Sequence, residues 1–233
     1  MTDYGGHIPE VRHLDGESAL IYTFRRLPGT DPAPVLSLPR GLATGIKTLR
    51  IEGRTTDSGI AEQMDLKDYI RDVPDFPEPG ILFKDITPLL GDVKAFDYTI
   101  SRLVECYREA DFDVIVPIES RGFLFGAPLA HALGKPIVPV RKPGKLPAAT
   151  YSMEYKLEYG SSTMEIHVDG VGRGQKVLIM DDLLATGGTL AATARLVEMA
   201  GGVVSNIGVI IELTFLEGRK NLAGYDLYSM IQY

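Results

Sequence analysis

Short apolar runs alternate with stretches of helical period from residue 96 onward. Continuous apolar runs are typical of strands buried on both faces of a parallel sheet. They cover residues 114–118, 137–140, 177–180 and 207–213, with 227–231 as a last edge strand. Apolar residues three or four positions apart predict helices over residues 96–108, 122–133 and 189–200. Strands that alternate with helices indicate right-handed βαβ units, so we expect an α/β fold with a central parallel sheet flanked by helices.

Two further regions carry weaker patterns. Residues 155–159 and the alternating residues 163–168 predict a β-hairpin, which follows a loop rich in proline and glycine. Residues 65–71 suit a short amphipathic helix. Residues 73–90 hold Pro74, Pro77 and Pro79, which favour an extended path with one small strand at 81–83.

The first 63 residues differ in composition from the rest of the chain. Prolines interrupt them, and apolar residues are sparse apart from a possible short strand at 19–24. Such a segment cannot bury enough apolar surface to offset its ordering entropy. We therefore expect residues 1–63 to be a disordered extension, or upstream sequence read from too early a start, with Met64 as the natural beginning. A docking or targeting arm is the alternative.

Composition narrows the class of protein. The chain has 233 residues, 45% hydrophobic and 24% charged, which suits one domain or one domain with an appendage. A single cysteine excludes an intramolecular disulfide and a cysteine-based zinc cluster. Because no apolar run approaches membrane-spanning length, we expect a cytoplasmic protein with no membrane partner. The net charge of −7 argues against a nucleic-acid partner, and any anion site must be built locally.

Residues 177–190 combine a buried strand, two acids and a small-residue loop that opens a helix. Glycine lets backbone N–H groups approach an anion closely, and the helix dipole contributes roughly 0.3–1 kcal/mol. Each hydrogen bond to a charged oxygen adds about 1.5–3 kcal/mol, so the donors outweigh the dipole. The expected phosphate loop consists of Ala185, Thr186, Gly187, Gly188 and Thr189.

The two acids, Asp181 and Asp182, stand where the predicted strand ends. Beside a phosphate loop they make sense only if the ligand also brings hydroxyls, a divalent cation or a carbon that becomes positive during reaction. A ribose 5-phosphate that carries a pyrophosphate meets all three conditions. The loop is not a Walker A motif, because no lysine follows its glycines, nor a dinucleotide fingerprint. With its two acids, the loop resembles the signature of the phosphoribosyltransferase family.

Cations follow the ends of two other predicted strands. Ser120 and Arg121 come directly after residues 114–118, and Arg121 offers a planar fork that suits phosphate oxygens. Arg141, Lys142 and Lys145 come directly after residues 137–140. Since both loops leave the carboxyl ends of sheet strands, we expect them to converge on the phosphate loop and to bind the pyrophosphate.

Five separated motifs sharpen the resemblance. They read PDFPEPGILFKDI (74–86), SRGFLFGAPLA (120–130), RKPGKLP (141–147), LEYG (157–160) and DDLLATGGT (181–189). As a set they resemble the adenine phosphoribosyltransferases over residues 64–233. The resemblance implies a type I phosphoribosyltransferase fold with a small N-terminal hood at 64–90 and a flexible β-hairpin lid. It also implies a homodimer that converts adenine and 5-phosphoribosyl 1-pyrophosphate (PRPP) to AMP and pyrophosphate in purine salvage.

The resemblance assigns roles to individual residues. Asp181 and Asp182 hold ribose hydroxyls or metal-bound waters, and Mg²⁺ is the expected cofactor, held mainly by PRPP without a direct ligand from the chain. Glu158 manages the proton of adenine, and Arg121 joins these acids as the fourth catalytic residue. The adenine site is formed by Leu82, Phe83 and Lys84, with Phe83 as the stacking ring. Arg141 is a candidate to act across the dimer interface.

Two alternatives remain open from the sequence. One is a PRPP-binding regulatory protein of the same fold, against which Glu158 and the intact RKPGK loop argue. The other is a phosphoribosyltransferase for xanthine or hypoxanthine, since base recognition by backbone groups leaves a weak sequence signal.

Overall fold

The structure, a computed structural model, describes residues 11–14, 17–20, 64–156 and 161–233. The chain divides into two units, Met1–Ser58 and Gly59–Tyr233. In the first unit, β1 (Val11–Leu14) and β2 (Glu17–Leu20) pair antiparallel. The strand predicted at 19–24 shares two residues with β2. Its other positions, like most of the predicted disordered extension at 1–63, lie outside the described residues.

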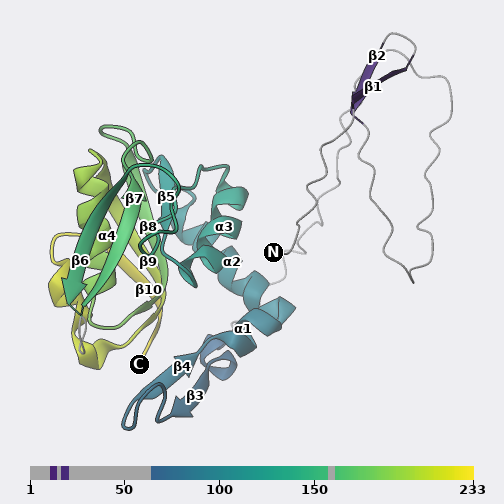
Figure 1. Ribbon diagram of the computed structural model, residues 1–233. Coiled ribbons are helices and arrows are strands. Elements are labelled where there is room, and N and C mark those ends of the chain that lie inside the picture. The colour runs from purple at the N-terminus through teal and green to yellow at the C-terminus, as the bar shows by residue number, and fades with distance from the viewer. Residues whose placement is uncertain (1–10, 15–16, 21–63, 157–160) are drawn as a thin grey trace, which may run out of the picture. The chain divides into compact units, whose positions relative to one another are not determined.

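The second unit contains the predicted parallel sheet. Its strands lie in the order β10-β9-β8-β5, and every neighbouring pair is parallel (Figure 1). They are β5 (Val114–Pro117), β8 (Lys176–Leu184), β9 (Val203–Glu212) and β10 (Leu227–Gln232). The α/β prediction is confirmed, and β10 is the edge strand that the sequence predicts.

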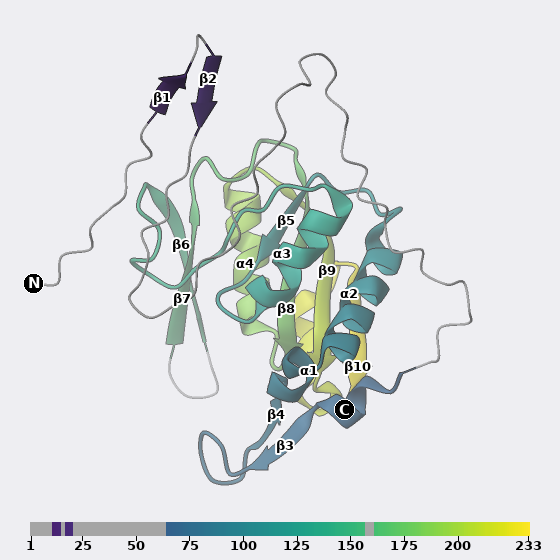
Figure 2. The ribbon, with the colours of Figure 1, turned by 90° about the vertical axis from the view of Figure 1, so that its right-hand side faces the viewer.

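Helices cover both faces of this sheet. The helices α2 (Val93–Tyr107) and α3 (Gly122–Leu133) lie on one face and α4 (Gly188–Met199) on the other (Figure 2). Alternate residues of β8 therefore enter different cores, as the pleat of a strand requires. Leu178 and Met180 pack with the α2–α3 layer, whereas Val177 and Ile179 pack with the α4 layer.

The predicted hairpin is present as β6 (Thr150–Lys156) and β7 (Ser161–His167), which pair antiparallel beside α4. Its first strand begins five residues earlier than the sequence predicts, because Thr150 pairs with His167 at the open end of the hairpin. Residues 157–160 lie outside the described residues.

The segment predicted as the hood begins with η1 (Leu66–Tyr69), a 3-10 helix shorter than the helix predicted at 65–71. The strands β3 (Arg71–Pro74) and β4 (Leu82–Asp85) then pair antiparallel. The extended path predicted for 73–90 is wrong at its end, where α1 (Thr87–Gly91) forms. Pro88 lies in the first turn of α1, where a missing N–H costs the helix nothing.

Two strand predictions need correction. Residues 137–140 form isolated bridges from Ile137 to Ile115 and from Val140 to Ile118, since Pro139 cannot donate to a continuous ladder. The strand predicted at 177–180 continues to Leu184, so Asp181 and Asp182 lie within β8 and not after it.

Two short 3-10 helices, η2 (Thr214–Leu216) and η3 (Gly218–Leu222), connect β9 to β10. None of the helices in the described ranges is both long and apolar enough to cross a membrane.

Candidate active site

A cavity of about 500 Å³ opens at the carboxyl ends of β5 and β8. This is the edge at which ligands bind in open α/β sheets. The cavity brings together ten of the residues predicted for the site, from three separate stretches of the chain. They are Ser120, Arg121, Lys142, Asp181, Asp182, Ala185, Thr186, Gly187, Gly188 and Thr189.

The two acids at the floor of the cavity are almost fully enclosed. Asp181 is 8% exposed and Asp182 is 5% exposed. The Asp182 N–H donates to Oδ1 of Asp181 at 2.9 Å. Burial raises the pKa of Asp181 well above its ordinary value, and the neighbouring Asp182 charge raises it further. Burial therefore makes a negative charge on Asp181 less favourable than it is in water.

Arg121 links the acid pair to the hood. Its Nε lies 2.8 Å from Oδ2 of Asp182. Burial raises the pKa of Asp182, and the Arg121 charge opposes that rise. The guanidinium carbon of Arg121 also lies 5.5 Å from the centre of the Phe83 ring, within the range of a cation–π contact. Phe83, the predicted stacking ring, thus contacts a residue of the cavity wall but does not line the cavity itself.

Close packing fixes the start of α3 at this position. A Cβ on Gly122, the first residue of α3, would lie 2.6 Å from the Met180 carbonyl oxygen and 3.0 Å from Oδ1 of Asp181. Any larger residue would push α3 away from β8. Gly122 therefore lets the residue before it, Arg121, reach Asp182.

The phosphate loop leads directly into α4. Gly187 precedes the helix with φ 83°, a left-handed conformation that glycine adopts without strain. Among the residues that the structure describes, no side chain caps this helix. The first N–H groups of a helix have no acceptor within it. Gly188 and Thr189, the first residues of α4, line the cavity. The loop therefore offers the donors that an anion needs.

Glu119 organises the cationic loop that follows Val140. Both of its carboxylate oxygens accept from the Arg141 guanidinium at 3.2 Å, and Oε2 also accepts from the Lys142 N–H at 2.9 Å. Burial would raise the pKa of Glu119, but the Lys142 N–H and Arg141 bring it below its ordinary value. Glu119 therefore stays ionised and holds Lys142 at the cavity.

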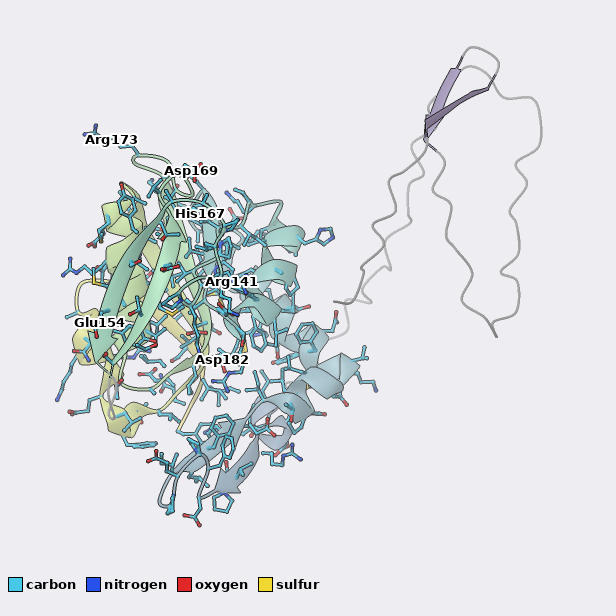
Figure 3. All side chains as sticks on the ribbon, viewed as in Figure 1. Arg141, Glu154, His167, Asp169, Arg173 and Asp182 are labelled. Carbon is cyan, nitrogen blue, oxygen red and sulfur yellow. The ribbon has the colours of Figure 1, made fainter. Side chains whose placement is uncertain are left out.

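Some predicted residues lie off the cavity wall, among the residues that the structure describes. Arg141, labelled in Figure 3 with Asp182, turns its guanidinium to Glu119. Lys145 is exposed. Lys84 contacts Asp72 and the ring of Tyr233, and Leu82 is 49% exposed. Glu158 lies outside the described residues.

Among the described residues, sequence reasoning missed five that line the cavity. They are Glu119, Tyr155, Met164, Leu183 and Leu190. Glu119 directly precedes the predicted Ser120, so its position was a usable signal. Tyr155 and Met164 come from the hairpin, and only the fold brings them to the acids.

The donor set fits a magnesium ion that arrives with its substrate. Across residues 64–156 and 161–233, no three His, Cys, Asp or Glu side chains gather closely enough to hold a metal by themselves. Mg²⁺ commonly keeps several waters and uses one or two carboxylates together with substrate phosphates. Asp181 and Asp182 supply two carboxylates of that kind.

A parallel sheet with an acid pair inside one strand and a phosphate loop after that strand is typical of a phosphate-binding transferase. A family model described as the phosphoribosyl transferase domain matches residues 92–221, more than half of the chain. The adenine phosphoribosyltransferase of Caldanaerobacter subterraneus subsp. tengcongensis is 60% identical over 169 residues, which cover 72% of this chain and 98% of that protein. The chain therefore belongs to the phosphoribosyltransferase family, and within it to the adenine phosphoribosyltransferases.

Solved structures give the same result. A crystal structure of adenine phosphoribosyltransferase from Thermoanaerobacter pseudethanolicus matches with a TM-score of 0.71 at 59% identity, over 72% of this chain and 98% of that one. The enzyme from Saccharomyces cerevisiae, in complex with an imino-altritol bisphosphate and adenine, matches with a TM-score of 0.67 at 40% identity, over 71% and 96%.

Proposed function

We propose that this chain transfers the 5-phosphoribosyl group of PRPP to adenine and releases AMP and pyrophosphate. One observation carries the proposal: a single cavity of about 500 Å³ joins a phosphate loop, a buried acid pair and Arg121. The structure of the yeast relative holds adenine and a bisphosphate, which are the two chemical parts of such a substrate pair.

The phosphate loop suits the 5-phosphate of PRPP. Residues 185–189 form one wall of the cavity, with the N-terminus of α4 among them. Thr186 and Thr189 add hydroxyl donors to the backbone N–H groups. Several such hydrogen bonds of about 1.5–3 kcal/mol each bind a phosphate firmly in an acidic protein.

The acid pair suits the ribose. In the reaction the C1–oxygen bond to pyrophosphate breaks, its electron pair leaves with the pyrophosphate, and N9 of adenine bonds to C1 as it loses its proton. Positive charge therefore builds on the ribose in the transition state, as in other glycosyl transfers. Asp181 and Asp182 accept from ribose hydroxyls and stabilise that charge in an enclosed site, where electrostatic effects are strong.

The opposite wall suits the pyrophosphate. Ser120, Arg121 and Lys142 line it, and Glu119 holds Lys142 in place. Lys145 lies in the adjoining loop and joins this group when the substrate is bound. Mg²⁺, when bound, neutralises charge on the leaving pyrophosphate.

The hood suits the base. Phe83 is half-buried, packs edge-on against Phe76 at 5.1 Å between ring centres and lies against Arg121. It offers a ring face for stacking, with the backbone of Leu82 and Lys84 beside it to read the purine edge. Glu158, from the LEYG motif, takes the proton of adenine, so Glu158→Gln lowers kcat more than it weakens PRPP binding.

The family resemblance further supports a homodimer, in which Arg141 of one protomer completes the site of its partner. Light scattering during size-exclusion chromatography measures the mass directly. A monomer at the concentrations of the activity assay would contradict this assembly.

The test of the activity is a panel of free bases with PRPP and Mg²⁺, followed by separation of the nucleotide products. AMP from adenine is expected to form far faster than the nucleotides of hypoxanthine, xanthine or guanine. A preference for another base would assign a different transferase. Absence of any nucleotide, with PRPP still bound, would favour the regulatory protein.

A further inference from the structure

The segment η3 packs against the phosphate loop without lining the cavity. Nδ2 of Asn221 donates to the Thr186 carbonyl oxygen at 2.8 Å. A Cβ on Gly187 would lie 2.5 Å from the Gly218 carbonyl oxygen, and a Cβ on Gly218 would lie 2.2 Å from the Ala185 carbonyl oxygen. Three consecutive residues of the loop therefore touch η3.

An ion pair between an exposed arginine and a buried glutamate fixes η3 to the end of the sheet. The Arg219 guanidinium donates to both carboxylate oxygens of Glu212, at 2.6 and 2.7 Å. Glu212, the last residue of β9, is only 3% exposed. Ser229 of β10 also donates to Glu212 at 2.6 Å, and Arg219 donates to the Leu227 carbonyl oxygen at 3.2 Å. The segment is thus held to two strands at once.

The hydrogen bond from Asn221 sets the direction of one donor in the loop. The Thr186–Gly187 peptide is trans and planar, so its carbonyl oxygen and its N–H point to opposite sides. With the oxygen held by Asn221, the Gly187 N–H points away from η3. Gly187 lines the cavity whereas η3 does not. The bond therefore aims this N–H at the side where a phosphate binds.

We propose that η3 is a brace that holds the phosphate loop in its binding conformation, with Asn221 as a positioning residue and the Arg219–Glu212 pair as the anchor. The inference rests on the proposed function, in which the loop binds the 5-phosphate of PRPP. It goes beyond that function by assigning a role to residues that touch no substrate.

Two fragments of PRPP test the brace, because ribose 5-phosphate reports on the loop and pyrophosphate on the opposite wall. In Asn221→Ala, the calorimetric Kd for ribose 5-phosphate is expected to rise about 2- to 10-fold, the loss of one hydrogen bond. The Kd for pyrophosphate stays at its original value. The KM for PRPP rises by the same factor while the KM for adenine is unchanged, and Asn221→Gln restores part of the loss.

A matched control is Asn206→Ala, since Nδ2 of Asn206 makes a similar hydrogen bond of 2.9 Å to Asp226 away from the cavity.

A second pair of variants compares Gly218→Ala with Gly91→Ala. The first places a Cβ against the Ala185 backbone, and the second meets no atom of the described part of the chain within 4 Å. Gly218→Ala is expected to weaken ribose 5-phosphate binding more than Asn221→Ala does, and Gly91→Ala not at all.

The outcomes separate the brace from the proposed function. If the unmodified protein forms AMP but Asn221→Ala and Gly218→Ala bind ribose 5-phosphate normally, the brace is overturned and the function stands. Equal weakening of both fragments together with a lower Tm would also overturn it, because that result shows a general loss of structure. If the unmodified protein binds ribose 5-phosphate but forms no AMP, the function fails and the brace is still judged by binding.

Discussion

Asp181 and Asp182 show how a folded chain changes the chemistry of ordinary side chains. In water two adjacent carboxylates would both be ionised at neutral pH. Here burial raises the pKa of each, and Arg121 pairs with only one of them. The two acids therefore have different electrostatic surroundings although they are neighbours in sequence. Such unequal pairs are common where an enzyme stabilises a developing charge.

Asp182→Asn tests the charge on the ribose side of the cavity. The substitution keeps the shape of the side chain but removes the charge that pairs with Arg121 at 2.8 Å. We expect kcat for AMP formation to fall about 100-fold or more, the scale of losing one preorganised electrostatic contact. Asp169→Asn is the control, because Asp169 is exposed and does not line the cavity. Near-normal turnover in Asp182→Asn would reject the assigned role.

Asp181→Asn tests how much the buried acid destabilises the folded protein. Folding raises the pKa of Asp181. The contribution of this carboxyl to the free energy of unfolding is therefore fully present below its ordinary pKa near 3.9, and it is lost as the pH rises through the raised pKa. Removing the ionisable group should therefore raise Tm relative to the unmodified protein, and the difference should grow from pH 4 upward. Each kcal/mol gained corresponds to about 2–4 °C. A difference that shrinks with rising pH would contradict this sign.

At the scale of elements, the site depends on contacts between segments far apart in sequence. The hood meets the start of α3 through Phe83 and Arg121, and η3 meets the phosphate loop through Asn221. These contacts orient groups that their own strands and helices could not place alone. Substitutions in the hood should therefore weaken binding of the base, and substitutions in η3 should weaken binding of the phosphate.

Phe83→Leu tests the hood. Leucine keeps apolar contact with Phe76 but removes the ring face beside Arg121. Since stacking of a base on an aromatic ring is worth about 1–3 kcal/mol, the KM for adenine should rise about 10-fold with little change for PRPP. Phe215→Leu is the control, because Phe215 is 68% exposed and belongs to η2 and not to the hood. An unchanged KM for adenine would remove Phe83 from the base site.

The sequence predicts the main elements because hydrophobic periodicity determines which residues a sheet and its helices bury. It misplaces the end of β8, because Asp181 and Asp182 are polar residues inside a strand whose backbone ladder continues to Leu184. The brace was not predicted, since no local pattern relates Asn221 to Thr186 across 35 positions. Local patterns reveal the donors of the site but not the contacts that orient them.

At the scale of the whole molecule, an acidic chain concentrates its anion-binding groups at one edge of one sheet. The net charge is −7, yet Arg121 and Lys142 line the same cavity as the N-terminus of α4. General attraction does not bring a phosphorylated substrate to such a protein. Local hydrogen-bond donors and cations bind the substrate instead, so its Kd should depend on individual residues more than on ionic strength.

Deletion of residues 1–63 tests where folding and activity reside. The unit from Gly59 to Tyr233 contains the four-stranded sheet and the residues of both cores. A chain that starts at Met64 should keep its Tm within a few degrees and its turnover within about twofold, measured by calorimetry and AMP formation. Loss of folding on truncation would overturn the interpretation of residues 1–63 as a dispensable extension.

The central claim is that the cavity and the hood beside it bind the phosphate and the base of the same nucleotide. A crystal structure with AMP tests it most directly, because AMP carries both groups. The phosphate is predicted to lie against residues 186–189, the ribose against Asp181 and Asp182, and the purine against Phe83. AMP bound elsewhere, with this edge of the sheet empty, would contradict the account.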